Sequence, residues 1–180
     1  MRTRLQRGAV LALMVSFLPL TGCFSVVKQA YYEVRGAQGE VLIITQPDAA
    51  ALARAAELTF SPATTTIGPG LCPSAVLRAY DRSANQLVAR LRPRYPGGEP
   101  QLAVTSDVQY FQKKGLLSGG LLLARVRMTV AGQPALDALV KSESQSFREG
   151  GEDDLADAAV AALGEFLARP ATPGAGERAQ

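Results

Sequence analysis

The stretch that decides the fold runs from Leu122 to Val130 and reads LLARVRMTV. Every second side chain in it is apolar, and the side chains between are mostly polar or charged, which predicts a β-strand with one buried face. The apolar set is Leu122, Ala124, Val126, Met128 and Val130, and it alternates with Leu123, Arg125, Arg127 and Thr129.

Two further strands are predicted beside it. The earlier one has a second alternating set, Leu102, Val104, Val108 and Tyr110, which we expect on its buried face. The later one is expected from about Ala135 to Phe147, with a polar half that is rich in serine. The connections around Gly115–Gly120 and Gly132–Pro134 are short, so the three strands favour an antiparallel meander over Leu102–Phe147.

Two amphipathic helices are predicted on either side of this meander. The first begins at Pro73 and ends before Pro93, and its apolar stripe is Val76, Leu77, Tyr80, Ala84, Leu87, Val88 and Leu91. The second opens after Gly151 and ends at Arg169, and its apolar face is Leu155, Ala159, Ala162, Leu163, Phe166 and Leu167.

The residues before Pro73 predict further strands. Val26–Arg35 favours a strand because of its tyrosines and valines. Glu40–Thr45 is β-branched and almost wholly apolar, as a buried strand would be. Pro47 suits the first turn of a helix that continues through Asp48–Glu57. Leu58–Thr66 indicates an edge strand or a bulge, because Pro62 removes a hydrogen-bond donor.

These elements together predict an α+β fold. We expect a mixed or antiparallel sheet of about five strands, covered on one face by the two amphipathic helices.

The amino terminus has the features of an export signal. Arg2, Arg4 and Arg7 precede an apolar run from Ala9 to Leu20, which is too short to cross a ~30 Å hydrocarbon core and suits a signal peptide. The next residues, Leu20-Thr21-Gly22-Cys23, resemble the lipobox of bacterial lipoproteins. That resemblance implies cleavage between Gly22 and Cys23 and a covalent lipid on Cys23. An ordinary secretory signal is the alternative interpretation.

The resemblance divides the chain into four parts. Residues 1–22 are the expected signal peptide, 23–26 the lipidated cysteine and a short tether, 27–169 a single α+β domain, and 170–180 a disordered tail rich in Pro, Gly and Ala. Phe24 stands where lipoproteins retained at the inner membrane often carry Asp, so the resemblance implies an outer-membrane lipoprotein that faces the periplasm.

Composition narrows the classes of function. Removing the three arginines of the signal lowers the basic residues from 19 to 16, which equals the 16 acidic residues, so a nucleic-acid-binding surface is not expected. The chain has no His, which removes the commonest general base and metal ligand. Cys72 is left as a lone thiol, and it is expected either as a buried small hydrophobe or as a reactive or intermolecular cysteine.

The order of elements is similar to a group of envelope lipoproteins that share the fold of the TolB amino-terminal domain and include LpoB-like and CsgG-like proteins. The resemblance covers roughly Val41 to Arg169 and rests on the lipobox, the helix beginning at Pro73, the meander and the closing helix. It is architectural, and the Tyr-rich start and the Thr64–Thr66 loop depart from the group. It therefore transfers no functional residue.

Three clusters are candidates for reactive or ligand sites. Glu149, Glu152, Asp153 and Asp154 lack the EF-hand spacing, and acids are expected at a helix start, so no metal is expected. Thr64, Thr65 and Thr66 with the Gly68–Gly70 loop suggest either an anion site or a structural turn, and no P-loop Lys follows. Asp107, Tyr110, Lys113 and Lys114 suggest either a catalytic pair or solvated side chains.

The apolar segment around Leu116, Leu117 and Leu121 is the predicted partner contact, because it lies at a hairpin tip. The sequence therefore predicts a non-enzymatic accessory or binding module for an envelope protein complex, with no cofactor. Contact by strand addition at the neighbouring sheet edge is one expected mode. The alternatives are an oligomeric secretion or transport component of the CsgG type and an enzyme.

Overall fold

The computed structural model of the protein describes residues 36–68, 70–115, 118–145 and 151–169. The predicted signal peptide, the lipobox, the strand at Val26–Arg35 and the tail lie outside these residues. The described elements in chain order are β1 (Gln38–Thr45), α2 (Ala49–Arg54), β2 (Glu57–Phe60), β3 (Thr64–Thr65), α3 (Ser74–Leu91), β4 (Gln101–Gln112), β5 (Gly120–Val130), β6 (Gln133–Ser144) and α4 (Glu152–Ala168).

The strands form one mixed sheet, which confirms the predicted α+β fold. Its strand order is β1-β6-β5-β4-β2, with β3 also paired to β4. Strands β1, β6, β5 and β4 are antiparallel neighbours, whereas β2 and β3 run parallel to β4. The predicted meander is therefore the centre of the sheet. Its β5–β6 turn holds Ala131 and Gly132 at positive φ (48° and 77°), as a tight two-residue hairpin requires.

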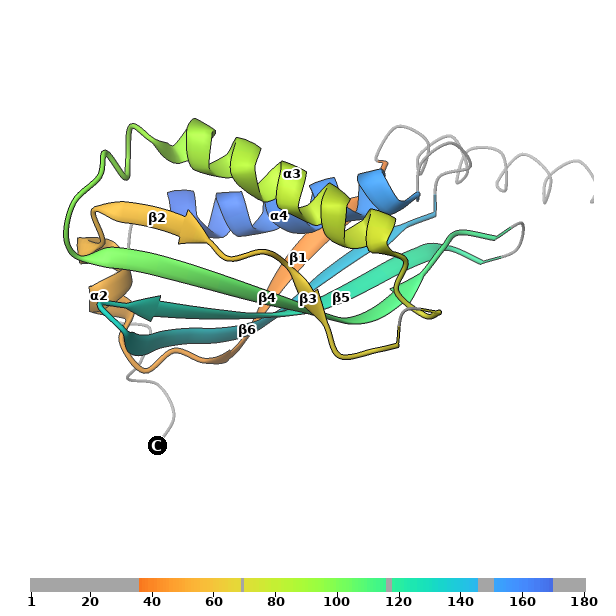
Figure 1. Cartoon of the computed structure of the whole chain (residues 1–180), viewed down its shortest axis with the longest axis horizontal. Coiled ribbons are helices and arrows are strands. Elements are labelled where there is room, and N and C mark those ends of the chain that lie inside the picture. The colour runs from red at the N-terminus through yellow and green to blue at the C-terminus, as the bar shows by residue number, and fades with distance from the viewer. Residues whose placement is uncertain (1–35, 69, 116–117, 146–150, 170–180) are drawn as a thin grey trace, which may run out of the picture.

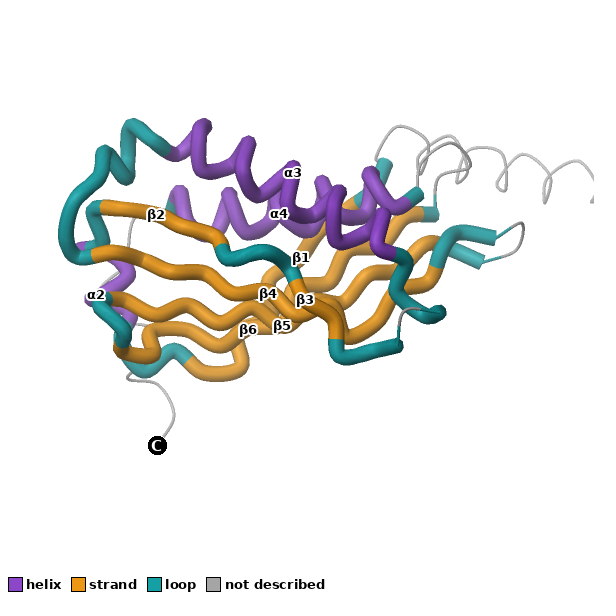
Figure 2. Tube along the Cα trace, viewed as in Figure 1, coloured by secondary structure: helices purple, strands orange, loops and turns teal. Residues whose placement is uncertain are grey.

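The two long helices lie side by side on one face of the sheet (Figures 1 and 2). They run in the same direction, because Arg82 of α3 pairs with Asp153 near the start of α4, and Arg94 beyond α3 donates to the Ala168 carbonyl at its end. The short helix α2 contacts β6 at one end of the sheet. We call the face that carries α3 and α4 the helix face and the opposite one the open face.

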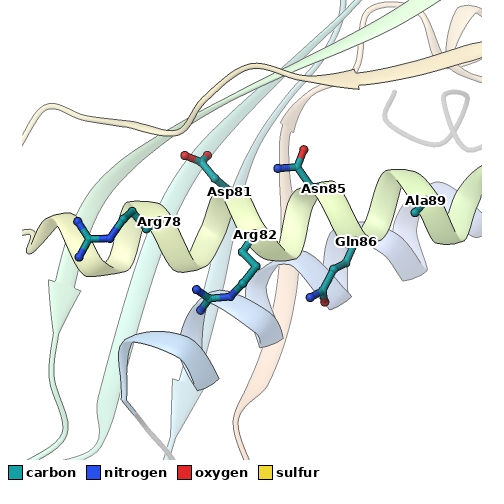
Figure 3. A pocket seen from close by; sticks show the side chains of 6 residues that line it. All are labelled: Arg78, Asp81, Arg82, Asn85, Gln86 and Ala89. Atoms are coloured by element: carbon teal, nitrogen blue, oxygen red, sulfur yellow. The ribbon is translucent and has the colours of Figure 1, made fainter.

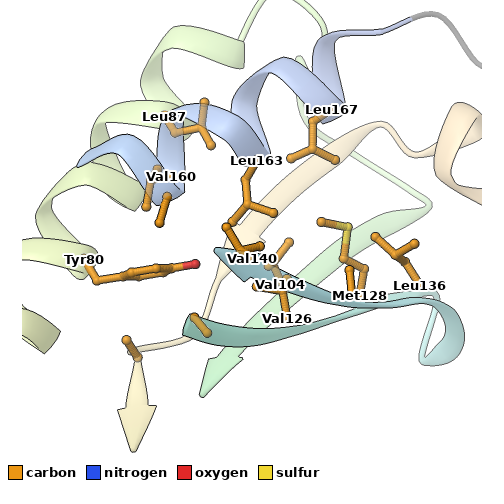
Figure 4. Close-up of a cluster of buried hydrophobic side chains, with 14 of the residues drawn as sticks. Tyr80, Leu87, Val104, Val126, Met128, Leu136, Val140, Val160, Leu163 and Leu167 are labelled. Atoms are coloured by element: carbon orange, nitrogen blue, oxygen red, sulfur yellow. The ribbon is translucent and has the colours of Figure 1, made fainter. Parts of the chain in front are cut away.

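The core fills the space between the helices and the sheet (Figure 4). Its largest fully buried side chains include Leu87 and Leu163 from the helices and Met128 from β5. The whole apolar set predicted for β5 is buried, because these side chains point to the helix face. Tyr80 is also buried, and its hydroxyl accepts a hydrogen bond from Ser106 Oγ at 3.2 Å.

Tyr110 does not lie on the buried face, so that part of the prediction is wrong. Val108 pairs with Ala124, but Tyr110 pairs with Leu123, so the register shifts by one residue at Gln109. A bulge of this kind moves every later side chain to the opposite face. Tyr110 consequently points to the open face and is 42 % exposed.

The strand at Glu40–Thr45 exists, but it is not buried as predicted. β1 is the edge strand of the sheet and pairs with β6, and its apolar side chains are largely exposed. The predicted helix after Pro47 is also shorter than expected. Asp48 caps its start by accepting from the Ala51 N–H at 2.7 Å, and it ends at Arg54 because Glu57 already pairs in β2.

Candidate docking surface

Three consecutive apolar side chains are exposed on the edge strand. Leu42, Ile43 and Ile44 are 42 %, 49 % and 54 % exposed, and we call them the edge patch. They account for most of the exposed large apolar side chains among the described residues, the others being Leu71 and Tyr110. Within the described part of the chain, β1 has a strand partner only on its β6 side. The edge patch therefore combines exposed apolar surface with an open row of backbone donors and acceptors.

The edge strand is held firmly in place by α4. A Cβ atom at Gly39 would lie 2.1 Å from the carbonyl oxygen of Ala158, so only glycine allows this close approach. Val41 is half-buried and packs against the core. The patch is consequently displayed by a strand whose position is fixed by packing.

The open face beside the patch carries paired charges. Leu42 lies opposite Leu139 in the sheet register, and the neighbouring residue Lys141 contacts Glu143 at 2.6 Å. The hydrogen bond to Glu143 raises the pKa of Lys141. Arg125 donates two hydrogen bonds to Asp137, at 3.0 and 2.6 Å. The hydrogen bond from Arg125 lowers the pKa of Asp137.

Because these charged side chains are paired with one another, the apolar side chains are the groups on this part of the surface that gain most from contact with another molecule. Each pair is partly exposed, so its contribution to stability is small. Its effect on recognition is to neutralise charges that would otherwise oppose burial next to the edge patch.

The predicted hairpin contact is only partly described. Leu121 is half-buried at the start of β5, between Gln112 of β4 and Glu143 of β6. Leu116 and Leu117 lie outside the described residues, and their role stays a prediction. Because β5 lies inside the sheet, strand addition cannot use β5 itself.

The structure does not assemble the predicted catalytic group. Asp107 accepts hydrogen bonds from the hydroxyls of Thr64 and Thr66, at 3.4 and 3.1 Å. Tyr110 donates to Gln112 at 2.9 Å, and Lys113 pairs with Glu152 at 3.2 Å. Lys114 is half-buried in the segment after β4. Within the described part of the chain, these contacts engage four other side chains, and none of them links Asp107, Tyr110 and Lys113 to one another.

The threonine cluster is explained by its structural contacts. Thr65 Oγ1 donates to the carbonyl of Val108 at 2.8 Å, and Thr64 Oγ1 lies 3.3 Å from the carbonyl of Ser106. With the Thr66 contact to Asp107, these bonds fix β3 against β4. Of the two interpretations of the threonine cluster, these contacts support the structural turn and not the anion site.

The acidic residues at the start of α4 are also engaged within the protein. Glu152 pairs with Lys113, Asp153 pairs with Arg82 at 2.6 Å, and Asp154 accepts from the Gly151 N–H at 3.1 Å. A hydrogen bond to its own backbone N–H is the main cause that lowers the pKa of Glu152. Glu149 lies outside the described residues. Within the described ranges, no three potential ligands gather as a metal site would require.

Cys72 is a buried side chain of the core, with 2 % of its surface exposed. Burial raises the pKa of its thiol. Both observations agree with the interpretation of Cys72 as a small hydrophobe, because a reactive cysteine needs access and a lowered pKa.

A shallow depression runs along the outer side of α3 (Figure 3). Its lining residues are Arg78, Asp81, Arg82, Asn85, Gln86 and Ala89. Asp81 accepts from the Ala63 N–H at 2.7 Å, and Arg82 reaches Asp153 of α4. These charged side chains hold neighbouring segments against α3, so the depression is a weaker candidate than the edge patch.

Comparisons with known proteins supply no family. No protein-family model matches the chain, and no curated protein matches it. Among solved structures, the chain is similar in shape to the PelC dodecamer from Paraburkholderia phytofirmans, at a TM-score of 0.45 and 12 % identity over 73 % of this chain and 99 % of that one. A variant of the same dodecamer gives a TM-score of 0.44 and 11 % identity over 73 % of this chain and 100 % of that one. Likeness at this level carries no functional conclusion.

None of the helices that the structure describes is both long and apolar enough to cross a bilayer.

The edge patch was not singled out from the sequence. The patch belongs to the apolar run Val41–Ile44, which is typical of a buried strand, and nothing local distinguishes a central strand from an edge. The distinguishing fact is that β1 pairs with β6, a strand about 100 residues later, and that no other strand of the described residues lies on the opposite side of β1.

Proposed function

We propose that the protein is a lipid-anchored accessory module of the bacterial cell envelope that binds another protein chain at the β1 edge, without catalysis of its own. The observation that carries this proposal is the edge patch, Leu42–Ile44, on a strand that has a neighbour on one side only among the strands that the structure describes. Exposed apolar surface next to unpaired backbone groups is the arrangement that strand addition uses.

The lipobox-like sequence Leu20-Thr21-Gly22-Cys23 supports the anchoring half of the proposal. Several acyl chains on Cys23 would hold the domain at a membrane, because each buried methylene contributes about 0.8 kcal/mol. The outer membrane, with the domain on the periplasmic side, is the location that the residue after the cysteine favours.

The sheet register supports a location of the anchored end of the domain near the predicted hairpin contact. Gln38 at the start of β1 pairs with Glu143, which in turn pairs with Leu121. The polypeptide that leads from Cys23 therefore enters the domain at the sheet end where β4 and β5 are connected. A partner bound there would itself lie close to the membrane.

Two measurements test the two halves separately. The anchor is tested by metabolic labelling with a palmitate analogue, and we expect Cys23→Ser to abolish the label and release the protein from membranes.

Docking is tested in cells with a photo-reactive amino acid in place of Leu42. The control carries the same photo-reactive amino acid in place of Asn85, on the outer side of α3. We expect a cross-linked protein at position 42 and none at position 85, and equal capture at both would contradict docking at the β1 edge.

A further inference from the structure

We infer that the partner at the β1 edge is a second copy of this chain, which adds its own β1 in antiparallel orientation around a two-fold axis. This inference rests on the proposed function and names the occupant of the same surface. The two sheets would join into one continuous sheet across the pair of β1 strands.

The chemistry of the edge favours a strand over a lipid surface. The exposed side chains of the edge patch are apolar, but the backbone between them presents N–H and C=O groups. Acyl chains cannot satisfy these groups, and leaving them unpaired in hydrocarbon costs several kcal/mol each. Another β-strand satisfies both the side chains and the backbone.

The edge is also self-complementary. A two-fold contact places the same patch on both copies, so like charges must not meet across the axis. β1 contains a single charged residue, Glu40, which lies opposite Lys141 of β6. Val41, Leu42, Ile43 and Ile44 form the remaining centre of the strand, so two copies can pair apolar against apolar.

The residues of β1 select one register. An axis at Glu40 would put two carboxylates face to face, and an axis at Val41 would put Glu40 opposite Leu42 of the second copy. An axis at Ile43 would put Ile44, where the β1–β6 pairing is interrupted by a bulge, in a central pair. An axis at Leu42 pairs Leu42 with itself and Val41 with Ile43, and it keeps the bulge away from the centre. In this register Glu40 faces Ile44 of the second copy, two residues from the axis, whereas an axis at Val41 would bring Glu40 into the pair next to the axis.

This register extends both faces of the sheet. Leu42 shares the open face with Leu139, so the contact would place two leucines of each copy in one row across the axis. Val41 and Ile43 point to the helix face, where Val41 already packs against the core of its own copy. The contact therefore continues existing apolar layers.

Cysteine cross-linking of the full chain, extracted from membranes in mild detergent, tests the register. In Leu42→Cys the two thiols face each other, with Cα atoms roughly 4.5–5.5 Å apart, inside the range for a disulfide. In the matched control Ile44→Cys they are four residues out of register, about 14 Å apart. With oxidised glutathione, we expect a disulfide-linked dimer of L42C and none above the wild-type level for I44C.

Light scattering of the same preparation tests whether the partner is a second copy of the chain. We expect twice the mass of one chain for the wild type and the mass of one chain for Ile43→Lys, since a lysine on an edge strand opposes pairing. The circular dichroism of I43K should be unchanged, because Ile43 is 49 % exposed.

Each other outcome overturns the inference. Equal cross-linking of L42C and I44C would contradict the proposed register. A monomeric wild type would contradict the inference that the partner is a second copy of the chain. If L42C is trapped instead with a different protein, the second copy is wrong and the proposed docking function stands. If the wild type is monomeric and neither position captures any chain, both proposals fail.

Discussion

Replacing Tyr80 with Phe should change stability in a way that depends on pH. Tyr80 is 1 % exposed, and burial raises the pKa of its phenol from 10.0 to about 12. The unfolded chain releases this proton near pH 10, whereas the folded protein retains it to about pH 12. The stabilising contribution of the protonated phenol is therefore fully present below pH 10 and is lost as pH rises through 12.

The size of the effect follows from these values. One pKa unit corresponds to about 1.4 kcal/mol, so the wild type should lose roughly 1.4 kcal/mol of unfolding free energy through Tyr80 between pH 8 and pH 11. Tyr80→Phe has no phenol proton at this position, so its unfolding free energy should not contain this pH-dependent contribution. At pH 8 it should be less stable than the wild type by about 1–2 kcal/mol, because the buried hydroxyl of Ser106 loses its acceptor.

Urea unfolding followed by circular dichroism at pH 8 and pH 11 measures both quantities. The stability gap between wild type and Y80F should shrink at pH 11, and Tyr110→Phe is the control because it removes an exposed phenol. A gap for Y80F that is the same at both pH values would refute the argument from burial of the phenol.

Three further substitutions test the packing that positions the edge strand, each measured by urea unfolding at neutral pH. Gly39→Ala should destabilise the fold by about 1–3 kcal/mol or more, because its Cβ would meet the Ala158 carbonyl oxygen; a neutral effect would show that β1 can shift away from α4. Ser142→Ala should cost about 1–3 kcal/mol, since the fully buried Ser142 hydroxyl donates to the Leu155 carbonyl at 2.6 Å. Leu163→Ala should cost about 2–5 kcal/mol by leaving a cavity under α4, and a smaller loss would indicate that the helix collapses onto the sheet.

The elements with a clear period were predictable from the sequence. The alternation from Leu122 to Val130 places each apolar side chain under the helices, as the structure has it. The stripe that begins at Val76 likewise lies on the inner side of α3, where Leu77, Val88 and Leu91 are half-buried and its other members are buried; Ala79 and Ser83 are buried too and were not predicted. In both cases the period of the element itself determines which side chains are buried, so local sequence is sufficient.

Deviations from a regular period were not predictable. The bulge at Gln109 turns Tyr110 to the open face, and no residue type in this stretch requires a bulge. The two buried serines of β6, Ser142 and Ser144, appeared as a polar half of the strand because a serine gives no local signal of burial. Ser142 is tolerated there because α4 supplies a carbonyl acceptor, which is a tertiary contact.

The candidate surface depends on the same kind of long-range information. The run Val41–Ile44 is as apolar as a central strand, and its exposure follows only from pairing with β6 at the edge of the sheet. Lysine, proline and inward-pointing charge are the usual protections of such an edge, and Val41–Ile44 has none of them. A protective feature that β1 does have is the bulge between Ile43 and Thr45. That bulge limits regular pairing to the first part of β1, which is the part whose apolar residues can be matched around Leu42. An edge that is protected at one end and apolar in its centre is suited to a short, register-specific strand contact.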